Sequence, residues 1–331
     1  MSTRKLYALA VSGVATLDMH SLNNEGGEGN QITTRMVNIV GEDGRMYNVN
    51  AISGDMFKHI HSEHLHRLAV AAGLPLSEGA RLFNANRANY DLAGESAKSE
   101  TANKTHAAML DWLLQRCAVT DMMGLLITAG NRSVLRKSVV EYGWTVGIPG
   151  HVETDSYFHV KYESERGKEA RDASASEEAR KANLRQAIFY RPASSGKYAV
   201  VVNVEAGRIG FNEIAQIYAV DEQGRAARYK TLLESLMYTF VEPAGAMRAT
   251  QNPHIVAFEG AITLSTDVVP APALSALNSG FAGELERVVA ALNTLRPGAL
   301  EVRRFTSMGE FAEVMAEITR TTEPFTLALA V

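Results

Sequence analysis

The chain has 331 residues, 46% of them hydrophobic, and carries a formal net charge of −4 at pH 7. This length can bury a large core, either as two domains or as one core with an insertion. The weakly acidic balance excludes a protein that coats nucleic acid with a uniformly basic surface, so a nucleic-acid binder of this composition has to concentrate its cations in one groove. Cys117 is the only cysteine. That count excludes a disulfide framework and a thiolate metal cage, and it favours a reducing compartment such as the cytoplasm.

The N-terminal region predicts a buried strand rather than a targeting segment. Residues 6–17 are apolar with many β-branched and small side chains, which is typical of a buried strand. Arg4 and Lys5 precede this run as they would in a signal peptide, but Ser12 and Gly13 interrupt it. No other segment approaches the roughly 20 apolar residues that span a membrane. We therefore expect a soluble, cytoplasmic protein without a membrane partner.

A hairpin and a long helix are predicted next. Residues 33–40 and 46–52 have strand character, and the Glu-Asp-Gly sequence at residues 42–44 indicates a tight turn between them. Ser53 then occupies the position of a helix N-cap, which predicts a helix over residues 54–72.

The rest of the chain alternates strands and helices. Further strands are expected at residues 124–128, 139–148, 187–190, 198–204, 255–264, 301–305 and 325–330, and further helices at residues 76–117, 225–241, 281–295 and 307–319. The Ser-Ser-Gly-Lys sequence at residues 194–197 predicts a hairpin turn. Residues 163–185 mix alanine, serine and both charges, which predicts a solvated, mobile insertion. This order favours an α+β fold with a largely antiparallel sheet covered by helices.

Four histidines follow the predicted N-cap. At about 100° per residue, His61 and His64 share the apolar face of the helix with Phe57, whereas His59 and His66 lie on the opposite face. One metal ion therefore cannot bind all four. The pair His61 and His64 could supply two ligands, but neither a glutamate on the same face nor a third ligand is evident from a motif. The alternative is that both imidazoles pack in the core and bond to backbone carbonyls.

The turn in front of the histidines, Ile52-Ser53-Gly54-Asp55-Met56-Phe57-Lys58, suits an anion. We expect Gly54 to let a ligand approach the backbone, where the helix offers unpaired N–H groups and a partial positive charge. Lys58 is one turn into the helix and could supply a point charge for a phosphate. The alternative is an ordinary N-cap with a solvated lysine.

Further cations surround this turn in the sequence. A loop rich in glycine and asparagine at residues 23–30 precedes Arg35, and Arg132, Arg136 and Lys137 follow the strand near residue 124. Together with Lys58 they would form a local basic track, which suits a protein that follows the backbone of RNA or of a single strand. Neither a Walker lysine pattern nor a G-x-G-x-x-G motif is present, so no nucleotide cofactor is expected.

These residues resemble a known family. The order Gly29-Asn30, Arg35 and residues 52–59 is similar to the N-terminal signature of the DevR-type CRISPR-associated proteins, the Cas-seven backbone subunits of type I Cascade complexes in the RAMP superfamily. Those proteins carry a Pro-Gly-Ser-Ser-Leu-Lys-Gly version of the turn. The sequence Asp121-Met122-Met123-Gly124 resembles their Asp-x-x-Phe-Gly strand, with methionine in place of the aromatic residue. Weaker matches at residues 153–158, 195–198, 202–204 and 243–246 extend the resemblance over residues 6–264.

The resemblance implies a fold, a function and partners. The fold would be an RRM-like (ferredoxin-like) palm of residues 1–73, 118–152 and 187–331, with a helical finger insertion at residues 74–117 and a thumb β-hairpin with a mobile charged segment at residues 153–186. The protein would be a non-catalytic CRISPR RNA-binding backbone subunit that polymerises along the guide RNA spacer for target DNA interference. Its partners would be the guide RNA, target DNA through the guide, further copies of itself in a helical filament and other Cascade subunits, with no cofactor and no bound metal.

The expected RNA contacts follow from the turn and the basic track. We expect Arg35 and Lys58 to pair with phosphates and His59 to contact RNA from the polar face of the helix. The full set of candidate RNA-binding residues is Asn30, Arg35, Ser53, Gly54, Asp55, Lys58, His59, Arg132, Arg136 and Lys137.

Three alternatives stay open at this point. One is an RNA-cleaving backbone subunit, as in type III complexes, that uses Asp18 or Asp55, although the sequence has no convincingly paired carboxylates for two-metal chemistry. The second is a metal hydrolase built on His61 and His64. The third is a transcriptional regulator, for which no helix-turn-helix with a basic recognition face is evident.

Overall fold

A ten-stranded sheet forms the centre of the molecule, whose computed structural model describes residues 4–29, 31–128, 133–161 and 187–328. Seven strands follow the order β15-β14-β2-β11-β10-β6-β5, and every neighbouring pair in that order is antiparallel. The strands are β2 (Ala8–His20), β3 (Asn24–Glu28), β4 (Gln31–Thr34), β5 (Met36–Val40), β6 (Met46–Ile52), β9 (Val140–Tyr142), β10 (Thr145–Lys161), β11 (Ala187–Val204), β14 (His254–Ser265) and β15 (Leu300–Phe305).

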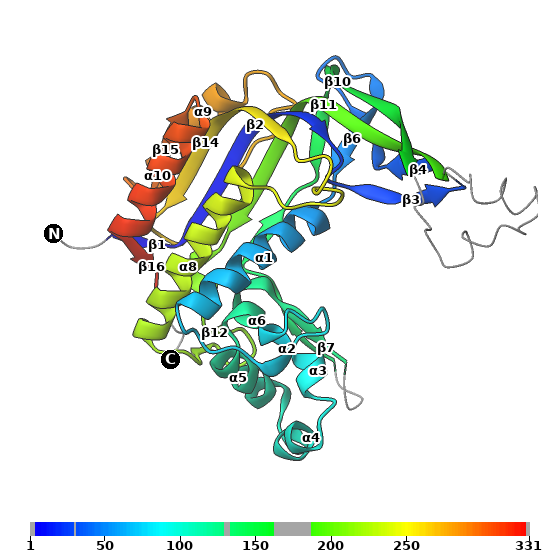
Figure 1. Ribbon diagram of the computed structural model, residues 1–331. Helices are drawn as coiled ribbons and strands as arrows, with labels where there is room; N and C mark the ends of the chain where they lie inside the picture. The colour runs from blue at the N-terminus through cyan, green and yellow to red at the C-terminus, as the bar shows by residue number, and fades with distance from the viewer. Residues whose placement is uncertain (1–3, 30, 129–132, 162–186, 329–331) are drawn as a thin grey trace, which may run out of the picture.

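Helices cover the sheet because alternate side chains of its central strands point to opposite faces. Helices α1 (Gly54–Ala71), α8 (Glu222–Val241) and α10 (Met308–Thr321) lie on one face (Figure 1), where Val11 of β2 and Val202 of β11 join the main core. Helix α9 (Phe281–Leu295) covers the other face, where Val14 and Ala199 meet Phe281. The central strands are therefore apolar at nearly every position. Within the described residues, no helix combines the length and the apolar character needed to cross a membrane.

The connections around α1 and α8 share one pattern. The chain passes from β2 through α1 to β9 and β10, and β11 lies between β2 and β10 in the sheet. It passes again from β11 through α8 to β14, and β2 lies between those two strands. Helices α1 and α8 pack against each other on the same face. The result is a β-α-β-β-α-β core with strand order β14-β2-β11-β10.

A second group of short elements forms a helical lobe below the sheet in Figure 1. It contains α2 (Glu78–Arg81), α3 (Ala88–Asp91), α4 (Glu95–Thr101), α5 (His106–Arg116), α6 (Ala118–Met123), β7 (Leu125–Ile127), β8 (Val134–Arg136), η2 (Ala206–Arg208), β12 (Phe211–Asn212) and β13 (Ile217–Tyr218). The lobe has a hydrophobic cluster of its own, in which Leu110 and Leu113 of α5 meet Ile127 and Val134.

A buried ionic cluster joins the lobe to the sheet core. The carboxylate of Asp121 in α6 accepts hydrogen bonds from Arg136 (2.7 Å), from Arg228 of α8 (2.7 Å) and from the backbone N–H of Gly210 (3.0 and 3.1 Å). The side chains of Asp121 and Arg136 are 0% exposed. Three segments that are far apart in the sequence are thus tied to one carboxylate.

The predicted hairpin at residues 194–197 is wrong. Strand β11 runs without interruption through these residues because it pairs with β10 on one side and β2 on the other. The turn-forming sequence is accommodated as a bulge, where the register to β2 shifts between Ser194 and Gly196 and Gly196 takes a φ of +147°.

Most other predicted elements are confirmed to within a few residues. These include the β5–β6 hairpin and helices α1, α8, α9 and α10. The expected final strand is misplaced, because β16 (Thr322–Pro324) precedes residues 325–330 and pairs in parallel with β1 (Arg4–Leu6). The charged run at residues 163–185 lies outside the described residues.

Candidate nucleic-acid interface

The turn at the start of α1 is held by a cap and by a loop asparagine. Ser53 is the N-cap, and its hydroxyl accepts a hydrogen bond from the N–H of Met56 (3.2 Å). The N–H of Ser53 in turn donates to the side-chain carbonyl of Asn23 (2.7 Å). The first N–H groups of a helix have no acceptor within the helix, so this end of α1 carries a partial positive charge.

Asn23 also fixes the position of Arg35. Its backbone carbonyl accepts the N–H of Arg35 (3.2 Å) and the hydroxyl of Thr34 (2.9 Å). The Arg35 guanidinium lies 5.5 Å from the ring centroid of Trp144 and forms an ion pair with Glu25. One asparagine therefore brings Arg35 and the α1 turn to the same place, as the sequence predicted for these two features.

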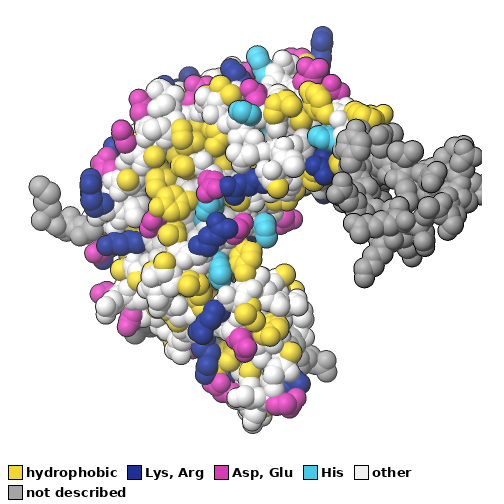
Figure 2. Space-filling model, in the orientation of Figure 1, with side chains coloured by type: hydrophobic (Ala, Val, Ile, Leu, Met, Phe, Trp, Pro, Cys, Tyr) yellow, Lys and Arg dark blue, Asp and Glu magenta, His cyan; other side chains and the backbone are white. Residues whose placement is uncertain are grey.

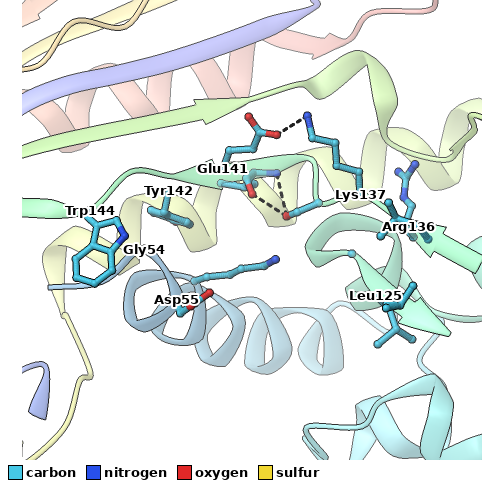
Figure 3. Close-up of a pocket in the computed structure, with 14 residues that line it drawn as sticks. Gly54, Asp55, Leu125, Arg136, Lys137, Glu141, Tyr142 and Trp144 are labelled. Carbon is cyan, nitrogen blue, oxygen red and sulfur yellow. Dashed lines mark hydrogen bonds and ion pairs between the residues drawn. The ribbon is translucent and has the colours of Figure 1, made fainter. Parts of the chain in front are cut away.

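A cleft of about 520 Å³ opens beside the turn. Figure 3 shows Asp55 on α1 opposite Glu141 and Lys137, with Trp144 towards one end and Leu125 towards the other. The ammonium of Lys137 is 2.5 Å from a carboxylate oxygen of Glu141. The cleft therefore contains acidic groups as well as cations.

Lys58 lies where this cleft meets a second, smaller cavity. Asp55 and Lys58 line both spaces, and the second cavity, of about 220 Å³, is also lined by His59, Phe83 and Arg87. Burial lowers the pKa of Lys58, and the nearby Arg87 lowers it further, while Asp55 raises it. The charged ammonium is thus poorly solvated, and an anion bound beside it would restore favourable interactions.

The surface around α1 carries further cations. In Figure 2, lysine, arginine and histidine side chains form a broken line over α1 and down onto the helical lobe, with acidic side chains beside some of them. A local line of cations of this kind is what a net acidic chain needs in order to bind nucleic acid.

Gly54 has a packing role that was not predicted. A Cβ atom at this position would lie 2.6 Å from the backbone carbonyl oxygen of Tyr142. The glycine therefore lets α1 pack closely against the β9 segment of the same chain, and ligand approach is not needed to explain it.

The predicted basic track is only partly present. The prediction for Arg136 is wrong. Its guanidinium is buried and donates to Asp121, to Glu213 and to the backbone carbonyls of Arg208 and Phe211. It has no free face for RNA. Lys137, the next residue, is exposed beside the cleft.

Two other candidates cannot be placed. Arg132 and Asn30 lie outside the described residues. His59 is exposed, and its ring is 5.8 Å from that of Phe83.

The other histidines have partners in the protein. His61 is buried and its Nε2 is 2.8 Å from the hydroxyl of Ser235, while Nε2 of the buried His64 donates to the carbonyl of Glu242 (2.9 Å). Burial lowers the pKa of His61 to about 3. In the part of the chain that the structure describes, no group of three or more His, Cys, Asp and Glu side chains is arranged to hold a metal ion.

The two carboxylates considered for RNA cleavage belong to different elements. Asp18 lies in β2 opposite His254 of β14, and Asp55 lies in the exposed first turn of α1. Asp55 borders the cleft.

Sequence reasoning missed several residues of this region. Asn23, Trp144, Phe83 and Arg87 were not singled out, because their positions depend on contacts across the fold. The asparagine alone had a local signal, since it begins the Gly/Asn-rich loop.

The fold and the cleft define a mixed α/β protein whose candidate site combines a helix N-terminus with a half-buried lysine. A family model described as "CRISPR-associated negative auto-regulator DevR/Csa2" matches residues 11–284. The chain belongs to this family and is a CRISPR-associated protein of the Cas7 type.

One curated protein and two solved chains are similar to this chain. The chain is 24% identical over 250 residues to the "CRISPR-associated protein Cas7/Csa2 1" of Saccharolobus solfataricus, which covers 73% of this chain and 74% of that protein. A solved chain described as "CRISPR RNA-guided surveillance complex, pre-nicking" is similar with a TM-score of 0.46 and 13% identity, covering 97% of this chain and 96% of that one. Another, described as "CRISPR RNA-guided surveillance complex", has a TM-score of 0.49 and 10% identity, covering 95% and 98%.

Proposed function

We propose that the protein is a CRISPR RNA-binding backbone subunit of a type I Cascade complex. In this proposal, copies of the chain polymerise along the guide RNA spacer and contribute to target DNA interference together with other Cascade subunits. Family membership supports this proposal, and one observation carries it, namely that Lys58 lies half-buried in a cleft at the N-terminus of α1. Guide pairing would read the target sequence, so the protein would supply shape and charge.

We further propose that the β-α-β-β-α-β core is an RRM-like palm. The strand order β14-β2-β11-β10 and the packing of α1 against α8 support this assignment. Residues 74–117 would form the finger, and the separate hydrophobic cluster of the helical lobe supports a unit of this kind. Residues 153–186 would form the thumb, of which the paired ends of β10 and β11 are described.

The cleft would bind the sugar-phosphate backbone of the RNA. The free N–H groups of the α1 turn and the Lys58 ammonium would receive one phosphate, and Arg35, held by Asn23, would approach a neighbouring one. Lys137 would contribute after separating from Glu141. Asp55 and Glu141 would repel phosphates from the rest of the cleft, so the strand would have a defined path.

The test is a salt titration of RNA binding. The isolated chain is expected to co-purify with short RNA, and Lys58→Ala should weaken binding and reduce the slope of log K against log salt by about 0.7 for one lost phosphate contact on a single strand. Lys98→Ala is the matched control, because Lys98 is exposed in the lobe beside Glu95 and does not line the cleft. An unchanged slope for Lys58→Ala would count against this assignment.

RNA cleavage is a second candidate function, and the position of Asp55 in the cleft is the observation that favours it. We expect the assembled complex, incubated with complementary RNA and magnesium, to leave the RNA intact. Regularly spaced fragments that disappear with Asp55→Asn would replace the non-catalytic proposal with this one.

A further inference from the structure

Two strained residues lie in the wall of the smaller cavity. Positive φ angles occur at five non-glycine residues of the described chain, and two of them are Phe83 (+52°) and Arg87 (+44°), both of which line this cavity. Left-handed backbone is unfavourable for residues that carry a Cβ. Strain of this kind persists where the surrounding structure enforces it, and it is concentrated at ligand sites.

Phe83 occupies a position that helices normally give to glycine. The N–H of Asn84 donates to the carbonyl of Gly79 (2.8 Å), and the N–H of Phe83 donates to that of Ala80 (3.1 Å). This pair of bonds is the Schellman motif, in which the left-handed residue after the helix is usually glycine. The end of α2 would therefore be more stable with glycine at residue 83, and helix stability does not explain the phenylalanine.

The Phe83 ring forms an aromatic wall of the cavity. It is 37% exposed, and its centroid lies 5.8 Å from that of His59 and 5.1 Å from that of His66. The rings are tilted by 49° and 45°. A flat π-system that enters the cavity would find an accessible aromatic surface beside polar groups.

Arg87 supplies a positioned cation in the lining of the same cavity. Its Nη1 donates to the backbone carbonyl of Gly124 (2.8 Å), and a Cβ at Gly79 would lie only 2.3 Å from the Arg87 carbonyl oxygen, so the backbone is packed tightly against α2. Burial lowers the pKa of Arg87, and its charge lowers that of Lys58. The cavity therefore brings together two poorly solvated cations that repel each other.

We propose that this cavity is a nucleotide subsite that receives one base of the bound RNA against Phe83 and His59 and the adjoining phosphate between Lys58 and Arg87. The inference rests on the proposed function and adds to it a place where a base is held. Asp55 and Lys58 line both the cavity and the cleft, so the two spaces adjoin and a strand that follows the cleft passes the cavity.

Phe83→Gly separates this role from a structural one. Glycine removes the ring and suits the left-handed backbone, so the variant should melt at the same temperature as the wild type or higher. Its affinity for a short homopolymeric RNA should fall about 5- to 140-fold, the loss expected for one stacked base. Phe83→Tyr should retain the affinity. Leu82→Ala is the matched control, because Leu82 is exposed next to Phe83 and does not line the cavity.

Inorganic polyphosphate, which has no bases, serves as the second ligand. Lys58→Ala should weaken the binding of both ligands, whereas Phe83→Gly should weaken only the binding of RNA. Wild-type affinity for RNA in Phe83→Gly would overturn the subsite and leave the proposed function standing, as would an equal loss for RNA and polyphosphate. A wild-type chain that binds neither ligand would overturn the proposed function itself.

Discussion

Asp121 is the carboxylate at the centre of the buried ionic cluster, and its replacement by asparagine has a calculable effect. Asparagine has nearly the same size and keeps one oxygen that can accept the N–H of Gly210. What Asp121→Asn removes is the negative charge between Arg136 and Arg228, each of which donates to it at 2.7 Å. The perturbation is therefore electrostatic, and the packing of α6 is retained.

The two arginines would be affected unequally. Arg136 would still have Glu213, whose carboxylate oxygen is 2.5 Å away. Arg228 is 2% exposed, and Asp121 is its ion-pair partner among the described residues. Removal of one partner from a buried pair leaves an uncompensated charge, which typically costs about 3–5 kcal/mol. We expect Asp121→Asn to lower the free energy of unfolding by that amount, mainly through Arg228.

Urea denaturation followed by circular dichroism measures this loss. The control Glu95→Gln breaks the exposed ion pair with Lys98 and should change the free energy of unfolding by less than about 1 kcal/mol. Because Arg228→Met removes the orphaned charge, the double variant Asp121→Asn/Arg228→Met should be about 1–3 kcal/mol more stable than the sum of the single effects predicts. Strictly additive losses would refute the reasoning, since they would mean that the two charges do not interact.

Three further predictions concern pH and packing. Burial lowers the pKa of His61 to about 3 and that of His20 to about 4, so the stability that these neutral groups provide is present above the unfolded pKa of 6.5 and is lost as the pH falls. Urea denaturation should show that the free energy of unfolding is about 4 kcal/mol lower at pH 5 than above that pKa. His61→Gln should roughly halve this decrease, and an undiminished decrease in the variant would contradict the prediction. Because the pKa of Lys58 is lowered, the affinity for RNA should already decrease with rising pH at pH values below those at which lysines usually titrate. Lys58→Arg should bind RNA with a flatter pH profile, and identical profiles for the two proteins would exclude this titration. Gly54→Ala should lower the free energy of unfolding by about 1–3 kcal/mol, and with it the melting temperature, because the added Cβ would collide with the carbonyl oxygen of Tyr142. An unchanged melting temperature would show that α1 can shift freely.

Local signals in the sequence were sufficient for the elements that local interactions determine. The Ser53 cap lies next in sequence to the helix that it begins, and the Glu-Asp-Gly turn lies between the two strands that it joins. The division of the histidines into a buried and a more exposed pair also follows from helix geometry alone, and burial confirms it.

Features that depend on distant residues were predicted poorly. Arg136 has the sequence context of a surface cation, and its burial is decided by Asp121, Glu213 and a loop about 75 residues further on. The close packing of Gly54 was not predicted, because its neighbour Tyr142 is remote in the sequence. The turn signal at residues 194–197 was local, and pairing on both sides of β11 overrode it. The positive φ values of Phe83 and Arg87 have no compositional signal at all.

The bulge at Gly196 has a consequence for the long arm formed by β10 and β11. Gly196 pairs with Val152, where the register of β10 also shifts, so both strands of the arm are irregular at one level. A Cβ at Gly196 would lie 2.2 Å from the carbonyl oxygen of His151, so close main-chain contact shapes this joint. The arm extends beyond it away from the helices (Figure 1). Its direction is thus set by backbone geometry at the joint, and side chains farther out can be exchanged to suit a different neighbour without redirecting the arm.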